Sequence, residues 1–163
     1  MNQVIEHLPE PDLALEMLRE RLTPNGRMVL VFPNMSSLCR RLSGSRWINW
    51  HIPYHLHHFD RKSFERMARH CGFEVVRART ITPNVWTLLQ LRASRYTPEL
   101  GQPSPIWSVT NRSDAATGNN RKGYFLRTLL RFGVLSTFAI VNRVVDALNM
   151  GDSLLVELRR SEQ

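Results

Sequence analysis

An unbroken run of five apolar residues, Met28 to Phe32, constrains the fold of this chain more than any other feature. Gly26 and Pro33 bound the run, so it has the length of a β-strand rather than of a helix. A strand with apolar residues on both faces is typical of a parallel sheet that is covered on both sides. The run therefore predicts an α/β protein in which this strand has neighbours along both edges.

Helical and extended patterns alternate around this run. Apolar residues at helical spacing predict a helix from Pro11 to Leu22, and a second helix is expected over Met35 to Leu42, ended by Gly44. Asp60 is a suitable N-cap residue for a third helix. The buried face of that third helix would hold Phe64, Met67, Ala68 and Cys71. The other expected elements are strands over Phe73–Thr80 and Ser153–Leu158 and a helix over Val85–Arg95.

The long segment before the last strand has two parts. Proline, glycine and small polar residues are frequent over residues 97–120, which predicts a long flexible loop. Residues 123–150 are strongly apolar, but charged residues interrupt them, and no run approaches the roughly 20 apolar residues of a membrane span. We therefore expect a single domain over residues 1–163, with amphipathic helices at 123–150 that form a lid or dock on a surface.

The chain is basic, with 22 lysines and arginines against 14 acidic residues. This excess fits either a surface for phosphate, nucleic acid or anionic lipid, or a solvated arginine-rich surface. No nucleic-acid-binding motif accompanies the charge, so we favour the solvated surface and do not expect a nucleic-acid partner. Two cysteines without a metal-binding pattern, and a start without a leader pattern, favour the cytosol.

Several short motifs occur along the chain in a fixed order. They begin with Glu6-His7-Leu8-Pro9-Glu10-Pro11 and continue with the turn Leu22-Thr23-Pro24-Asn25-Gly26 and the strand exit Pro33-Asn34. The later ones are Trp47 and Trp50, Pro53, His55, His58-Phe59, Gly72-Phe73 and Gly151-Asp152. In this order and spacing, the motifs resemble the second half of a class I S-adenosylmethionine-dependent methyltransferase.

The resemblance implies a doubly wound sheet of seven strands with an antiparallel last strand and the cofactor at the carboxyl ends of the first strands. The glycine-rich loop that normally holds S-adenosylmethionine has no counterpart, because the eight glycines nowhere form G-x-G-x-G. We therefore expect an incomplete Rossmann-like methyltransferase sheet with helices on both faces. A truncated gene model, a genuine fragment and a degenerate paralogue would each explain the missing half.

The resemblance also implies roles for residues near the start. His7 is the expected catalytic base, and Gln3 and Glu6 are the expected cofactor contacts. The alternative is that Glu6 and His7 only cap and brace the following helix. Some relatives that methylate quinone-pathway phenols hold a metal with an acid three residues before the Glu-His pair. Gln3 stands at that position, and a neutral amide is a poor ligand for a hard cation, so we predict no metal there.

Four later residues are candidates for substrate contact. Trp47 and Trp50 would wall an acceptor pocket if they share one face, although packing of a lid on the sheet explains them as well. His55 and His58 would contact the substrate or support the structure. The histidines at 51, 55, 57 and 58 suggest zinc, but they lack a cysteine pair or an H-E-x-x-H pattern. We predict no zinc site.

Two functions follow from these observations. The first is S-adenosylmethionine-dependent methyl transfer, expected at oxygen, to a small-molecule, glycan or lipid-precursor acceptor. The second is a non-catalytic binding or assembly module that pairs with another chain or with a membrane surface. An apolar strand edge without a neighbour is a template for pairing, so we also expect self-association.

Overall fold

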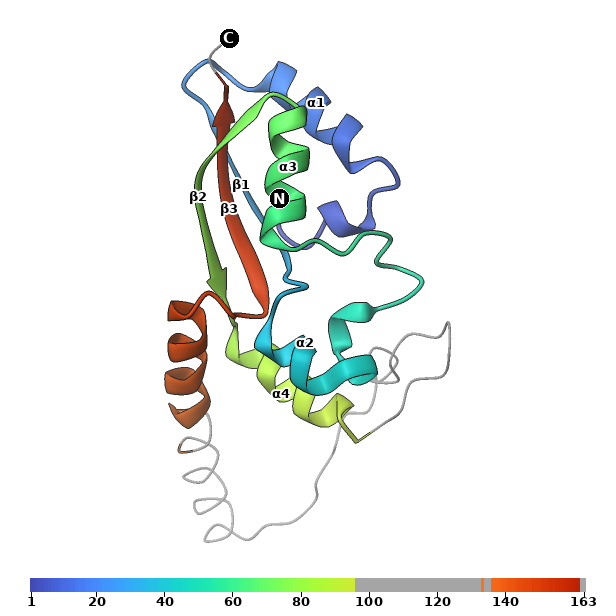
Figure 1. Cartoon of the computed structure of the whole chain (residues 1–163), viewed down its shortest axis with the longest axis vertical. Coiled ribbons are helices and arrows are strands. Elements are labelled where there is room, and N and C mark those ends of the chain that lie inside the picture. Colours follow the sequence, from blue (N-terminus) through green and yellow to red (C-terminus); the bar gives the residue numbers. More distant parts are fainter. Residues whose placement is uncertain (96–132, 134–135, 162–163) are drawn as a thin grey trace, which may run out of the picture.

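The computed structural model describes residues 1–95, 133 and 136–161, which form one sheet with helices beside it and below it (Figure 1). The expectations for residues 97–120, and for 123–132 of the amphipathic stretch, lie outside the described residues. The named elements, in chain order, are η1 (Ile5–His7), α1 (Pro11–Arg21), β1 (Arg27–Pro33), α2 (Leu38–Ser43), η2 (Gly44–Arg46), η3 (Ile48–Trp50), α3 (Arg61–His70), β2 (Phe73–Ile81), α4 (Asn84–Ala93) and β3 (Ser153–Arg160). Residues 136–147 form a further helix.

The sheet has three strands in the order β1-β3-β2, and β3 is antiparallel to both neighbours. Val29 pairs with Glu157 on one side of β3, and Val75 pairs with Leu158 on the other. The expected antiparallel last strand is therefore confirmed, and it lies between the two strands that precede it in the chain. This arrangement brings the carboxyl ends of β1 and β2 to the same end of the sheet.

The first three residues of the chain lie along the outer edge of β1. The Gln3 N–H donates to Val31 O at 2.8 Å, the Val31 N–H donates to Met1 O at 3.0 Å, and Asn2 forms a parallel bridge with Val31. The Met1 ammonium group donates to Val29 O at 2.7 Å. Among the described residues, the expected second neighbour of β1 is therefore present only as this short parallel segment.

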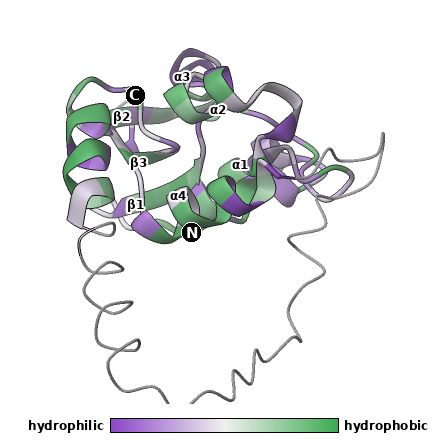
Figure 2. Cartoon of the chain, turned by 90° about the horizontal axis from the view of Figure 1, so that it is seen from below, coloured by the Kyte–Doolittle hydropathy of each residue, from purple (hydrophilic) through white to green (hydrophobic). Residues whose placement is uncertain are grey.

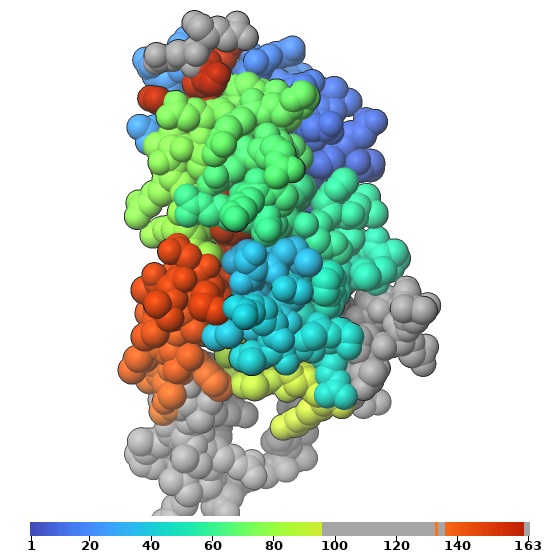
Figure 3. Space-filling view, in the orientation of Figure 1, coloured from blue at the N-terminus to red at the C-terminus, as the bar shows by residue number. Residues whose placement is uncertain are grey.

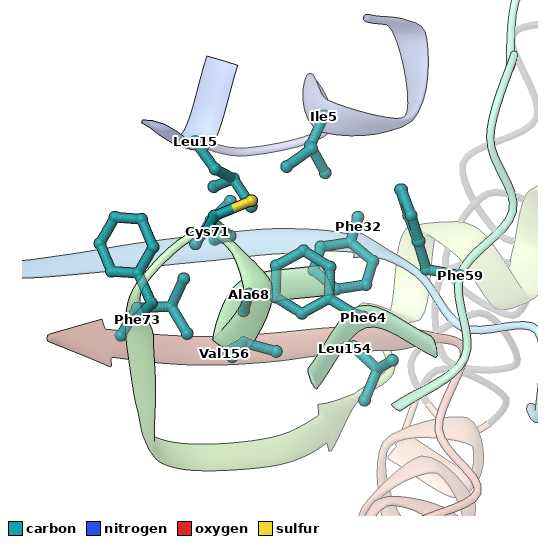
Figure 4. Packing of buried hydrophobic residues seen from close by; sticks show 12 residues of the cluster. Ile5, Leu15, Phe32, Phe59, Phe64, Ala68, Cys71, Phe73, Leu154 and Val156 are labelled. Carbon is teal, nitrogen blue, oxygen red and sulfur yellow. The ribbon is translucent and has the colours of Figure 1, made fainter. Parts of the chain in front are cut away.

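One face of the sheet carries the hydrophobic core. Leu30 and Phe32 of β1 and Leu154, Val156 and Leu158 of β3 point to this face, where α1 and α3 cover them. Figure 4 shows the rings of Phe32, Phe59 and Phe64 meeting at the centre of the cluster, and the centroids of Phe32 and Phe64 lie 4.4 Å apart. The expected core residues Phe64, Ala68 and Cys71 are buried, and Met67 packs against the same cluster.

The opposite face of the sheet is different from what the apolar run predicts. Val29 is 46% exposed, and Val31 and Leu155 are only partly buried, so the described helices leave this face open. Side chains alternate between the two faces of a strand, so the same run that fills the core also places valines on the open side. Within the described residues, helices cover one face of the sheet rather than both.

Local chemistry explains most element boundaries. A capping box begins α3, in which the Ser63 N–H donates to Asp60 Oδ1 at 2.7 Å, and Gly72 follows the helix with φ +75°. A bulge in β2 at Val76 explains why its apolar alternation is irregular. The second helix begins at Leu38 rather than at Met35, because Ser37 caps it by accepting from the Arg40 N–H.

The helix of residues 136–147 lies beside α2 and the end of the sheet (Figure 3). A helix is therefore present in the part of residues 123–150 that the structure describes, and its role as a lid or docking element stays a prediction. Apolar side chains remain exposed on it at Ile140, Val141 and Val144, and its ribbon shows green hydrophobic segments in Figure 2. No helix among the described residues is long and apolar enough to cross a membrane.

Candidate functional site

The site forms where the loop of residues 51–58 folds back on η1. The N–H groups of Leu56 and His57 both donate to Glu6 O, at 2.9 and 3.1 Å. This pairing of backbone groups brings together two segments that lie about 50 residues apart in the sequence. The segment between β1 and α3 therefore returns to the start of the chain beside the end of the sheet.

Three ionisable side chains converge at this junction. One carboxylate oxygen of Glu6 and one ring nitrogen each of His7 and His55 lie within 4.8 Å of one another. The ring centroids of His7 and His55 are 4.6 Å apart, and His51 lies 4.9 Å from His55. We call Glu6, His7 and His55 the Glu–His cluster. Glu6 and His55 are buried, whereas His7 is partly exposed.

Backbone carbonyls fix the tautomers of both cluster histidines. His7 Nδ1 lies 2.9 Å from Tyr54 O, and His55 Nδ1 lies 2.7 Å from Asn49 O. A carbonyl oxygen can only accept, so Nδ1 carries the proton in each ring. The Nε2 atom of each neutral ring is then left with a lone pair, which can take a proton or bind a metal.

Burial controls the charges in the site. It raises the pKa of Glu6, although the nearby N–H groups of Glu6 and Val4 and the charge of His7 act in the opposite direction. Burial lowers the pKa of His55 to about 4, and it also lowers the pKa of His51. His55 is therefore a neutral imidazole at neutral pH.

Trp47 lies inside the molecule rather than along an open pocket. It is 2% exposed, and its Nε1–H donates to Asp152 Oδ1 at 2.8 Å. The same carboxylate accepts from Ser37 Oγ at 3.1 Å and from Asn49 Nδ2 at 2.9 Å. Asp152 thus anchors the segment that carries the candidate residues, in agreement with the alternative that Trp47 packs a lid on the sheet.

The sequence contained a signal for this anchor, in the Gly151-Asp152 pair before the last strand. A Cβ atom at Gly151 would come within 2.8 Å of the Thr80 Cβ and would also collide with Asp146, so only glycine fits there. The close approach positions Asp152 under Trp47. Ser37 and Asn49 had no comparable signal, because their role depends on a partner more than 100 residues away.

Trp50 and His58 extend the site away from the cluster. Trp50 is partly exposed, and its ring packs edge-on against that of Trp47 with the centroids 5.6 Å apart. Its Nε1–H donates to Gly44 O. His58 packs against Trp50 at 5.1 Å, with its Nε2 atom 3.1 Å from Trp50 O. Both side chains have internal hydrogen-bond partners and one partly exposed surface. Substrate contact by these residues stays a prediction.

Gln3 occupies the turn between the edge segment and η1. It is partly exposed, with φ +53°, and its backbone is held by Val31. Glu6, in contrast, is 1% exposed, and its carboxylate lies in the Glu–His cluster. Gln3 and His7 are therefore the partly exposed members of the predicted set at this end of the sheet.

Comparison with known families finds a match for the part of the chain that contains this site. Residues 1–78 match the family model described as a methyltransferase domain. This match supports a class I S-adenosylmethionine-dependent methyltransferase-type domain over residues 1–78. The match contains η1 and the whole of residues 51–58, so every predicted site residue of the methyltransferase domain lies inside it. Among curated proteins, none matches the chain.

The hollows of the described structure lie apart from the predicted cofactor contacts. The hollows in the described residues include one of about 620 Å³ beside α3 and one of about 390 Å³ between α2 and α4. Neither is lined by Gln3, Glu6 or His7. Contact of Gln3 and Glu6 with S-adenosylmethionine therefore stays a prediction.

Proposed function

We propose that this chain forms the acceptor side of an S-adenosylmethionine-dependent methyltransferase. The match of residues 1–78 to a methyltransferase domain carries the proposal. The proposal includes an incomplete Rossmann-like sheet, and the strand order β1-β3-β2 with its antiparallel last strand is consistent with it. S-adenosylmethionine would supply the methyl group when bound. The residues of this chain would bind the acceptor and hold its proton.

His7 is the proposed general base. Its Nδ1–H is held by Tyr54 O at 2.9 Å, so the ring has a fixed orientation, and its Nε2 lone pair is able to take a proton from an acceptor hydroxyl. A positioned base of this kind contributes about 10²–10⁴-fold to the rate. The proposed methyl acceptor is therefore an oxygen atom whose proton leaves during transfer.

The surface beside His7 favours an acceptor with an apolar part. Ile52, Tyr54 and Leu56 of the same loop are all about half exposed, and Tyr54 is 57% exposed. Exposed apolar residues gathered next to a polar centre commonly mark a binding surface. A lipid precursor or another small molecule with an apolar tail fits this loop better than a bare glycan. Contact of the loop with a membrane surface, from a cytosolic location, belongs to the same proposal.

The proposal predicts cofactor binding and a large effect at His7. Calorimetric titration of the purified chain with S-adenosylmethionine is expected to show saturable binding. Transfer of a labelled methyl group to a panel of hydroxylated apolar acceptors should fall about 10²–10⁴-fold in His7→Ala, with cofactor affinity unchanged. His70→Ala is the matched control, because His70 is exposed at the end of α3. Folded protein without saturable binding would contradict the proposal.

The open sheet face favours a second candidate, an assembly module. Val29 lies on this face, and beyond Met1 the outer edge of β1 has no neighbouring strand among the described residues. An exposed apolar face and an unpaired strand edge are both surfaces on which a second copy or another chain can bind. This candidate requires no cofactor, so the titration with S-adenosylmethionine distinguishes the two functions.

Self-association is the expected behaviour of the isolated chain. Light scattering coupled to gel filtration should show a dimer or larger species that Val29→Lys shifts toward monomer, because a charge would be buried in the contact. Leu42→Lys is the control, since Leu42 is 79% exposed on α2, away from the sheet. A monomer of the wild-type chain that persists across concentrations would count against an interface on this face.

A further inference from the structure

The Glu–His cluster contains a buried carboxylate without a hydrogen-bond partner. Glu6 is 1% exposed, and neither of its carboxylate oxygens has a partner among the described residues. A buried, unpaired carboxylate is costly, and native proteins compensate such groups with a donor or a cation. Its nearest ionisable neighbours are the two imidazoles of the cluster. Each neutral imidazole of the cluster donates its Nδ1–H to a backbone carbonyl, which leaves the Nε2 lone pair without a proton.

The two histidines have the arrangement that metal ligands show in proteins. The Nδ1 atom of each ring lies against a backbone carbonyl, that of Tyr54 for His7 and that of Asn49 for His55. Metal-binding histidines usually donate their other ring N–H in this way, which fixes the ring and makes the ligating nitrogen more basic. These carbonyls would form the outer shell of a metal site.

We propose that Glu6, His7 and His55 bind a divalent transition-metal ion of the zinc class. Two imidazole nitrogens and one carboxylate oxygen are a ligand set of catalytic zinc and non-haem iron, whereas magnesium and calcium prefer oxygen ligands. The ligand atoms now lie within 4.8 Å, and a tetrahedral ion with bonds of about 2.1 Å would draw them to about 3.4 Å. Binding of the ion would therefore require the three side chains to move closer together.

The ligand set differs from that of the relatives that hold a metal at their Glu-His pair. The proposal replaces our prediction of no metal. Gln3 has no part in it, and His55 supplies the third ligand from a different segment. The backbone bonds from Leu56 and His57 to Glu6 O hold that segment in place. His51, with its ring 4.9 Å from that of His55, stands beside the ligands, and a fourth position would go to it or to water.

Metal binding and the role of His7 as the proposed base exclude each other, but they can be tested separately. The Nε2 lone pair of His7 cannot bind an ion and accept a proton at the same time. A metal-loaded site would therefore remove His7 as a base, and binding of the ion can be measured without cofactor or acceptor.

Titration of the full chain, first stripped with EDTA, tests the site. Cobalt(II) is expected to bind with one-to-one stoichiometry and visible absorption, and zinc should displace it. Glu6→Gln and His55→Ala should each weaken binding by at least tenfold, since loss of even an outer-shell partner costs about 10–100-fold. His70→Ala removes an exposed histidine and should bind as the wild type does.

Thermal unfolding provides a second measurement that does not depend on a fragile variant. Glu6→Gln keeps the shape of the side chain and removes its charge, so without metal it should melt at or above the wild-type temperature. Zinc at about 100 times the wild-type dissociation constant should raise the wild-type melting temperature by about 5–10 °C, and that of Glu6→Gln by at most about half as much. Equal binding by wild type and Glu6→Gln, or no binding by the folded wild-type chain, would overturn the proposal.

Discussion

Replacement of Asp152 by alanine is expected to lower the free energy of unfolding by about 3–5 kcal/mol. Its carboxylate accepts from Trp47, Asn49 and Ser37, and all three donors are buried. Each buried donor left without an acceptor costs about 1–3 kcal/mol, and partial relaxation of the segment reduces their sum. Urea denaturation, followed by circular dichroism, measures the change.

A different aspartate provides the control for this prediction. Asp60→Ala removes an N-cap at the surface of α3 and should cost only about 1 kcal/mol. Tryptophan fluorescence, measured with the other three tryptophans replaced by phenylalanine, adds a local readout, because the Trp47 indole should become more mobile and more solvated in Asp152→Ala than in Asp60→Ala. A loss below 1 kcal/mol in Asp152→Ala would mean that this carboxylate does not anchor the segment.

Phe64→Ala is expected to destabilise the core by about 3–5 kcal/mol, the usual range for a buried phenylalanine. The Phe64 side chain is fully buried, and its ring lies 4.4 Å from that of Phe32 and 5.7 Å from that of Phe59. Its removal leaves a cavity between α3 and the sheet that neighbouring side chains fill only in part. The midpoint of urea unfolding should shift accordingly, with an unchanged slope.

An exposed apolar residue on a neighbouring helix is the control for the core prediction. Met17 lies on α1 and is 48% exposed, so Met17→Ala should change the unfolding free energy by less than about 0.5 kcal/mol. Similar losses in Phe64→Ala and Met17→Ala would be incompatible with the core described above.

Most elements could be predicted from the sequence because their signals are local. The spacing of Phe64, Ala68 and Cys71 identifies the buried side of α3, and the Asp60 cap and Gly72 mark its ends. The open sheet face could not be predicted in the same way. An apolar strand looks the same in sequence whether or not something covers its second face, and at Val29 nothing among the described residues does so.

The candidate site shows the limit of motif reasoning more clearly. The Glu6-His7 motif contains two members of the Glu–His cluster, but the third member could not be chosen among four histidines between residues 51 and 58. That choice depends on how the loop bends back to Glu6 O, which is a long-range property. Trp47 drew attention for its aromatic spacing, and the structure places it on the buried Asp152 carboxylate.

A chain of hydrogen bonds joins the helix of residues 136–147 to Trp47. The Asp146 carboxylate accepts from Thr82, Thr82 Oγ1 accepts from the Asp152 N–H, and the Asp152 carboxylate accepts from the indole. A ligand or surface that displaces this helix would thus disturb the Trp47 indole, at the other end of this series of hydrogen bonds. Events at residues 136–147 should therefore change the intrinsic tryptophan fluorescence of the protein, which can be measured without any added dye.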